Sequence, residues 1–200
     1  DKYIRAYCWN IGQNCCGGLG MYQEYQMDVS DASHWLIAHP HDPQITKSLP
    51  PFVITEAGKF FARKTYFTTR REKPVFLILF TLAGRGRLYY EDGEYLLSQG
   101  DVAFINCHYG HRYHTSEDSD GDWVFEWIHF HGQSVSLYYD MLFQTGFRPF
   151  SLGADLEIKP FFELLQPDFE RSDFYSLCRR SHLVSRLLTR LADEMSLQHA

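Results

Sequence analysis

The sequence predicts a mainly β domain, a closed sandwich or barrel, followed by C-terminal helices. Three observations support this fold class. Residues 51–132 hold about eight short strand-like stretches separated by glycine-containing turns, a spacing typical of sandwiches and barrels. One of these turns contains Asp92-Gly93 between two apolar stretches, the strongest short-range signal for a β-hairpin. After Gly132 the apolar residues recur at helical spacing, so the last part of the chain is predicted to be α-helical.

The composition is that of a globular protein. Of 200 residues, 44% are hydrophobic and 22% are charged, so a folded domain is expected rather than a disordered chain. Aromatic residues reach 16%, which favours a ligand site because aromatic rings stack on sugars and bases. The net charge of −6 argues against DNA binding through the bulk surface, because DNA binders need a basic face to neutralise phosphates.

The cysteines indicate a reducing compartment. There are 5, an odd number with irregular spacing, and the chain contains no C-x-x-C pair. No apolar run is long enough for a transmembrane helix, and the first residues lack the apolar core of a signal peptide. We therefore expect a cytoplasmic protein with no membrane partner.

The elements before the barrel core are the least regular. Residues 1–50 show no clear period and are expected to form an N-terminal arm with one short helix. Residues 51–69 look like two short strands with a break near Gly58. The continuous apolar run at 75–82 is predicted to be a strand buried on both faces. Gly84 and Gly86 allow a sharp bend, and the Gly100-Asp101 turn begins the next strand.

The stretch 100–132 is the most informative part of the sequence. Its first strand ends in a histidine cluster, and its second strand alternates aromatic and imidazole side chains with other residues. Because side chains in a strand repeat every two residues, one face of this strand is predicted to hold Trp123, Phe125, Trp127, His129 and His131. An aromatic wall that ends in imidazoles is typical of a small-molecule pocket.

Three helices are predicted after the barrel. The first covers 134–145 and stops at Gly146, and a shorter one covers 157–166. The last, from 172 to about 197, carries an apolar stripe, and Leu183 and Leu187 widen it into a second, adjoining face. One face can pack on the barrel while the other meets a partner helix. A single broad stripe buried within the monomer fits these residues equally well.

Two kinds of site compete for the histidine-bearing strand. His129-x-His131 puts two imidazoles on one face, and His111 is the natural third metal ligand. However, no glutamate follows His131 at the short spacing expected of metal-binding barrels, which argues against a metal. The chain also has no G-x-S-x-G or Walker-type motif and no paired acid and base. We therefore predict no metal, no cofactor and no catalytic residue. Carbohydrate recognition needs flat aromatic faces with polar groups at the edge. Trp123 and Trp127 can supply the faces, and the donors and acceptors can come from Tyr113, His111 and His129. Phe125 fits a pocket wall and a filled barrel equally well.

At this point a family resemblance is visible. Residues 77–115, LILFTLAGRGRLYYEDGEYLLSQGDVAFINCHYGHRYHT, followed by WVFEWIHFHG at 123–132, resemble the N-terminal effector-binding and dimerisation domain of AraC/XylS transcription regulators. TGFRPF at 145–150 and the closing leucine-bearing helix continue the similarity, which covers about residues 50–198. Each motif alone is weak, but their order and spacing together are fairly specific.

The resemblance implies a cupin-like barrel, a double-stranded β-helix, that binds an effector inside, often a sugar. It further implies an N-terminal arm at 1–50, the barrel at 51–132 and a helical dimerisation region at 133–200. By position, Trp127 matches the tryptophan on which the sugar stacks in the arabinose regulator, and Tyr113 matches a hydroxyl-bearing contact. His111 matches a histidine at the pocket floor. Two positions differ from that regulator: Phe125 stands where it has a histidine, and Ala83 stands where it has a sugar-binding arginine.

The working hypothesis is therefore an effector-sensing domain that forms a homodimer through Leu183, Leu187 and Leu191. Its DNA contact would come only through a helix-turn-helix domain that is absent from this chain. We therefore expect the chain to be an excised sensor domain. The alternative hypothesis is a metal-dependent cupin enzyme, an isomerase or dioxygenase, that uses His111, His129 and His131.

Overall fold

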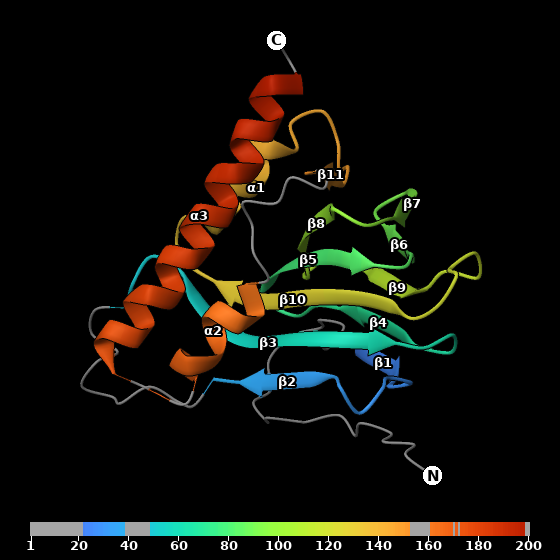
Figure 1. Cartoon of the computed structure of the whole chain (residues 1–200). Coiled ribbons are helices and arrows are strands. Elements are labelled where there is room, and N and C mark those ends of the chain that lie inside the picture. Colours follow the sequence, from blue (N-terminus) through green and yellow to red (C-terminus); the bar gives the residue numbers. More distant parts are fainter. Residues whose placement is uncertain (1–21, 39–48, 153–160, 170, 172, 199–200) are drawn as a thin grey trace, which may run out of the picture.

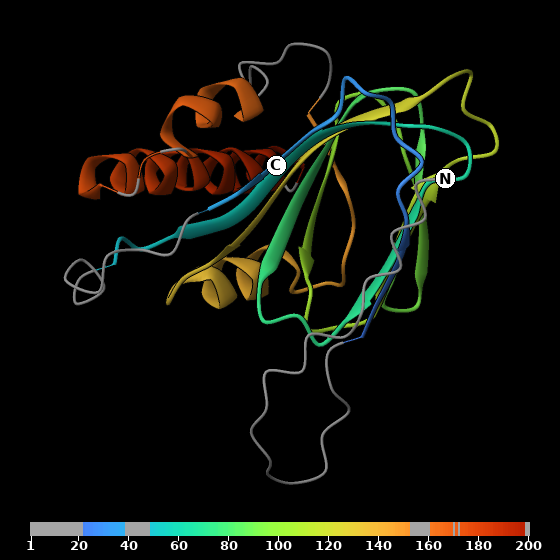
Figure 2. The same ribbon diagram turned by 90° about the horizontal axis from the view of Figure 1, so that it is seen from below.

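A computed structural model of the chain describes residues 22–38, 49–152, 161–169, 171 and 173–198. Within these residues the chain forms two antiparallel sheets that face each other, with helices on the outer side of one of them (Figures 1 and 2). The first sheet has the order β1-β4-β9-β6-β7 and the second has the order β11-β8-β5-β10-β3-β2. The strands of the first sheet are Tyr22–Gln26 (β1), Phe67–Arg71 (β4), His111–Thr115 (β9), Gly86–Tyr90 (β6) and Gly93–Leu97 (β7). Those of the second are Phe150–Ser151 (β11), Asp101–Asn106 (β8), Phe76–Ala83 (β5), Trp123–His131 (β10), Val53–Ala62 (β3) and His34–Ile37 (β2).

The strands from β3 to β10 give the mainly β architecture that the sequence predicts. β5 is buried along most of its length, as the apolar run at 75–82 predicts. The Asp92-Gly93 hairpin forms between β6 and β7, where Tyr90 pairs with Gly93 and Glu91 takes a positive φ. Gly100 takes a φ of 88° in the turn before β8, a conformation that favours glycine.

Gly58 does not break a strand, and the sequence-based expectation is wrong here. β3 runs without interruption from Val53 to Ala62. A Cβ at Gly58 would lie 2.5 Å from the indole of Trp127 on the neighbouring strand β10. The glycine is therefore explained by a close approach between a backbone and a ring, which is the other common reason for glycine within a strand.

The N-terminal segment contributes strands rather than the expected short helix in the part that the structure describes. β1 pairs with β4 at the edge of the first sheet, and β2 pairs with β3 at the edge of the second. The segment 22–37 thus extends both walls of the barrel (Figure 2). Residues 1–21 and 39–48 of the expected arm lie outside the described residues.

The three helices pack on the second sheet and on one another: Val135–Leu142 (α1), Phe161–Phe169 (α2) and Phe174–Gln198 (α3). α2 contacts β2, β3 and β10, while α3 contacts β3 and both other helices (Figure 1). None of the described helices is long and apolar enough to cross a membrane.

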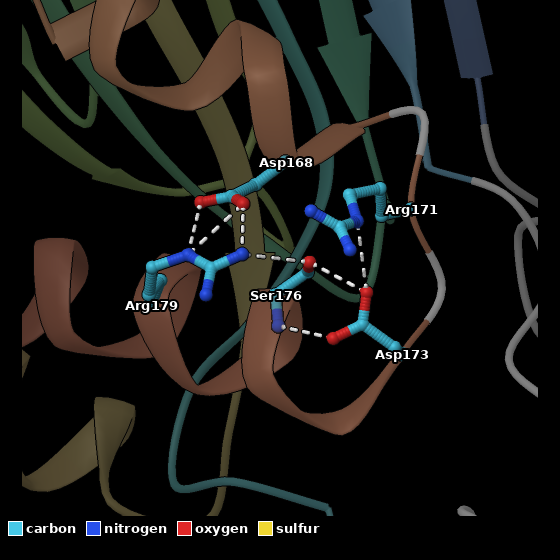
Figure 3. A network of polar contacts seen from close by, with 5 residues as sticks. All are labelled: Asp168, Arg171, Asp173, Ser176 and Arg179. Atoms are coloured by element: carbon cyan, nitrogen blue, oxygen red, sulfur yellow. Dashed lines mark hydrogen bonds and ion pairs between the residues drawn. The ribbon is translucent and has the colours of Figure 1, made fainter.

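Polar contacts join α2 to the start of α3 (Figure 3). The Arg179 Nε–H donates to both carboxylate oxygens of Asp168 at 3.0 Å. Asp173 caps α3, because its carboxylate accepts hydrogen bonds from the backbone N–H and the hydroxyl of Ser176, at 3.0 and 2.9 Å. Arg171 pairs with the same carboxylate at 3.3 Å. The orientation of α3 is thus tied directly to α2.

The leucines assigned to a second subunit need a correction. Leu187 and Leu191 are 5% and 1% exposed, and both belong to the core of this chain. They lie over a narrow apolar gap shared with Ile78 and Phe80 of β5 and Phe161 of α2. Only Leu183 of the three keeps part of its surface open. The broad-stripe alternative, burial within the monomer, therefore describes Leu187 and Leu191.

Candidate functional site

The candidate site lies between the two sheets, along the inner face of β10. Trp123, Phe125, Trp127 and His129 point inward in succession, and each is at most 3% exposed. Their partners come from the opposite sheet: Trp123 and Phe125 pack against Tyr113 of β9, and His129 meets Arg70 of β4. The pairing of β10 with β3 shifts register between His129 and Phe130, and His131 at the end of β10 is exposed. His131 thus takes no part in the interior.

One end of the interior is filled by packed aromatic rings. The rings of Trp123 and Phe125 lie 4.1 Å apart, and Tyr113 meets each of them edge-on at 6.2 and 6.3 Å. The Trp123 indole N–H donates to the Thr81 hydroxyl at 3.2 Å, so it has no open polar group. Trp123 and Phe125 therefore form the packed base of the barrel, and their direct contact with a ligand stays a prediction.

The other end holds a buried polar cluster that the sequence analysis missed. Arg70 of β4 is 7% exposed, and its Nη1–H donates to the Nε2 of His129 at 2.9 Å. Since Nε2 accepts this bond, the ring proton of His129 sits on Nδ1, which faces the Glu56 carboxylate at 3.4 Å. Lys73 pairs with the same carboxylate at 3.0 Å.

Burial and pairing determine the charges in this cluster. Burial lowers the pKa of His129 to about 3, so the ring is neutral near pH 7. Burial opposes ionisation of Glu56 as well, but its hydrogen bond with His129 and the charge of Lys73 hold its pKa well below the usual range. Burial also raises the pKa of the Cys107 thiol to about 12, which keeps it protonated. The cluster therefore contains the cations of Arg70 and Lys73 and the anion of Glu56.

His111 completes the polar end from β9. It lies opposite Arg70 in the β4–β9 register and stacks on Tyr113 at 6.2 Å. Its Nδ1–H donates to the Tyr109 carbonyl at 3.0 Å, which leaves Nε2 as an acceptor. Burial lowers the pKa of His111 to about 4, so it too is neutral.

Trp127 lies between the aromatic and polar ends. Its ring rests on Gly58 and is surrounded by Phe60, Trp35 and His129, with ring centroids at 5.4, 6.1 and 5.1 Å. Its Nε1–H finds no partner among the described residues. The same holds for Arg70 Nε and His111 Nε2. The space between the two sheets therefore contains two buried donors and one buried acceptor that lack a hydrogen-bond partner among the described residues.

The metal site of the alternative hypothesis does not assemble among the described residues. No group of three His, Cys, Asp or Glu side chains is close enough to hold an ion there. His111 and His129 both face the interior, but His131 is exposed on the far side of the register shift.

Arg70 and Glu56 were missed for a clear reason. In the sequence Arg70 belongs to the polar run RREKP, which looks like a loop, although the alternation Thr68, Arg70 places both on the inner face of β4. Glu56 precedes the supposed break at Gly58. Neither residue differs locally from a surface residue, because only the pairing of the strands shows which face is enclosed.

The outer face of β10 connects this interior to the helices. Glu126, between Phe125 and Trp127, is fully buried beneath α2, and its Oε2 accepts the backbone N–H of Phe162 at 3.1 Å. Lys59 lies 3.9 Å from the other carboxylate oxygen. Burial raises the pKa of Glu126 to about 7 despite these two contacts. One strand therefore holds candidate ligand contacts on one face and the start of α2 on the other.

Comparison with known proteins assigns the family. The model of the AraC-like ligand binding domain matches residues 59–194, and the chain belongs to this family. No curated protein matches it significantly.

Its similarity to solved structures is distant. It is similar to the plu4264 protein of Photorhabdus luminescens, with 15% identity, 71% of this chain and 98% of that one covered, and a TM-score of 0.39. It is also similar to the cupin domain of an XRE-family transcriptional regulator from Enterobacter cloacae, with 12% identity, 50% and 96% coverage, and a TM-score of 0.35. YhaK from Escherichia coli matches with 15% identity, 50% and 45% coverage, and a TM-score of 0.41. The two antiparallel sheets followed by C-terminal helices confirm the predicted mainly β fold class.

Proposed function

We propose that this chain is the effector-sensing and dimerisation domain of an AraC-type transcription regulator, and that it binds a sugar or sugar derivative between its two sheets. Binding would control DNA contact by a separate DNA-binding domain. In this proposal the domain is not an enzyme, and it works in the cytoplasm, where the DNA is. Membership of the AraC-like ligand-binding family supports the sensing role.

The observation that supports an interior ligand best is the set of unmet polar groups. Buried donors and acceptors are nearly always hydrogen-bonded, because an unmet buried group is costly. Here Trp127 Nε1, Arg70 Nε and His111 Nε2 all lack partners among the described residues. A polyol matches them, since one hydroxyl can accept from Trp127 while another donates to His111. The face of the Trp127 ring suits the apolar side of a sugar.

Ligand binding at β10 has a short path to the helices. A shift of Trp127 moves the strand that also holds Glu126, and Glu126 receives the N–H at the start of α2. α2 is joined to α3 through Asp168 and Arg179 (Figure 3). An effector that binds two positions of β10 with different affinity would change the orientation of α3 in this way.

A panel of monosaccharides and sugar acids in a thermal-shift assay tests the proposal. We expect one class to raise Tm by mass action, and Trp127→Ala to abolish the rise. Trp127→Phe, which keeps an aromatic ring but removes the N–H and part of the indole surface, should weaken the rise without abolishing it. Tyr175→Phe, at a residue 75% exposed on α3, is the matched control and should respond like the parent chain. A Tm rise that survives Trp127→Ala would show that the interior site is not the one used.

Dimerisation is proposed through the outer face of α2 and α3. A hollow of about 600 Å³ between them is lined by Leu164, Leu183 and Arg186 among others, and Leu164 is 52% exposed. We expect Leu183→Asp to convert a dimer to a monomer in sedimentation velocity at tens of micromolar. Leu197→Asp, at an exposed residue outside the hollow, should leave the dimer intact. A parent chain that is monomeric at this concentration would contradict the proposal.

The metal-dependent cupin enzyme is tested by metal analysis. Protein prepared without chelators should contain no stoichiometric Fe, Mn, Ni or Zn. A stoichiometric metal that is lost in His111→Ala and His129→Ala would replace the sensor proposal with the enzyme.

A further inference from the structure

The polar end of the barrel holds more positive than negative charge. Among the described residues, the carboxylate of Glu56 is already paired with Lys73 at 3.0 Å. Arg70 makes no ion pair within the same part of the chain, and its bond is to a neutral imidazole, that of His129, at 2.9 Å. The thiol of Cys107 and the phenols of Tyr66 and Tyr113 stay protonated because burial raises the pKa of each. One guanidinium charge is therefore left over in a buried site.

Such a charge is costly unless something in the site compensates it. A buried ion that is not paired loses its hydration and gains little in return. Arg70 is 7% exposed, and its Nε has no hydrogen-bond partner among the described residues.

We propose that the effector carries one carboxylate, and that Arg70 receives it while Trp127 and His111 contact the rest of the molecule. The inference rests on the proposed effector-binding function and narrows its ligand to a sugar acid. A guanidinium matches a carboxylate because two parallel N–H groups meet two oxygens. A single negative charge balances Arg70 and leaves the Lys73–Glu56 pair undisturbed. A phosphate ester, with close to two charges, would exceed the balance.

Matched ligand pairs test the charge of the effector. Galacturonate and galactose, like glucuronate and glucose, differ only in a carboxylate at C6. In calorimetric titration of the chain we expect one acid to bind at least tenfold more tightly than its neutral partner, and Arg70→Gln to remove most of this difference. Glucose 6-phosphate should bind less well than the acid. Tighter binding of a neutral sugar that is abolished by Trp127→Ala would retain the proposed function and overturn the carboxylate. Tighter binding of the phosphate would also overturn it.

A second measurement needs no ligand. Arg70→Gln removes the surplus charge, and because its side chain is shorter it also loses the hydrogen bond to the neutral His129 ring. Loss of the surplus charge offsets loss of this bond, so the Tm without ligand should stay close to that of the parent chain. Lys73→Gln removes the cation that pairs with Glu56 and leaves that carboxylate only its contact with His129, so its Tm should fall. If the two variants lose stability equally, Arg70 is already compensated within the protein and the inference fails, whatever the sugar panel shows.

Discussion

Gly58 offers the sharpest test of how the interior is packed. A methyl group at this position would lie 2.5 Å from the Cε2 and Nε1 atoms of Trp127, far inside the usual carbon contact of about 3.5–4.0 Å. The ring cannot withdraw freely, because Phe60 and Trp35 flank it at 5.4 and 6.1 Å. Gly58→Ala therefore forces either the indole or strand β3 to move.

The expected cost is that of overpacking. Inserting a methyl group into a packed site typically costs about 1–3 kcal/mol. Alanine in place of glycine returns about 0.4–1 kcal/mol by restricting the unfolded chain. The net loss of unfolding free energy is then roughly 1–2 kcal/mol, which lowers Tm by roughly 2–8 °C in a domain of this size.

Calorimetry or circular dichroism melts measure this loss, and Gly121→Ala is the control. A Cβ at Gly121 meets no atom within 4 Å, and its φ lies outside the left-handed region. We expect its Tm to equal or slightly exceed that of the parent chain, because alanine restricts the unfolded chain here without a clash. If Gly58→Ala melts together with Gly121→Ala, the Trp127 ring does not rest on β3 and the candidate site is wrongly built.

Three further predictions concern other groups. The pKa of Glu126 is raised from 4.5 to about 7, so the folded state binds the proton more tightly and stability falls as pH rises from about 5 to 8. The fall in unfolding free energy is at most about 3 kcal/mol. Urea unfolding at pH 5 and pH 8 measures it, and Glu126→Gln should make the fall smaller. An equally steep fall in the variant would show that another group titrates. Asp168→Asn should lower Tm slightly at pH 7 and much less at low pH. The reason is that the hydrogen bond from Arg179 lowers the pKa of Asp168, and protonation of Asp168 at low pH weakens this contact in the parent chain as well. A Tm loss that is independent of pH would show that the carboxylate charge is not what joins α2 to α3. Alkylation by iodoacetamide, followed by peptide mass spectrometry, should modify Cys178 well before Cys107, which is buried and has a pKa near 12; equal rates would contradict the burial of Cys107.

Strand patterns in the sequence were a reliable guide where one face is buried. The alternation along 123–131 correctly placed Trp123, Phe125, Trp127 and His129 on one face, because the side-chain period of a strand is a local property. His131 has the parity of the same face but is exposed, because it is the last residue of β10 and lies beyond the enclosed interior. Where a strand leaves the interior depends on the strands packed around it, and the pattern within one strand does not report it.

The final helix shows a similar division. Its apolar stripe was visible in the sequence, and so was the uncertainty about the adjoining leucines. Leu187 and Leu191 of α3 are buried against β5 and α2. They are covered because α2 packs on the part of the sheet that α3 alone would leave open. Helical spacing shows which residues share a side of the helix, but the position of α2 determines which sides are free.

The candidate site divides in the same way. The family resemblance and the aromatic strand identified a β barrel with Trp127, His111 and Tyr113 inside, since these features depend on local spacing and on motifs in a fixed order. The polar residues opposite them, Arg70 and Glu56, became visible only once β3, β4 and β10 were brought together. A charged residue in a short polar stretch looks the same whether it faces water or an interior. Its environment, and hence the surplus charge that the effector is proposed to balance, is set by contacts between strands far apart in the chain.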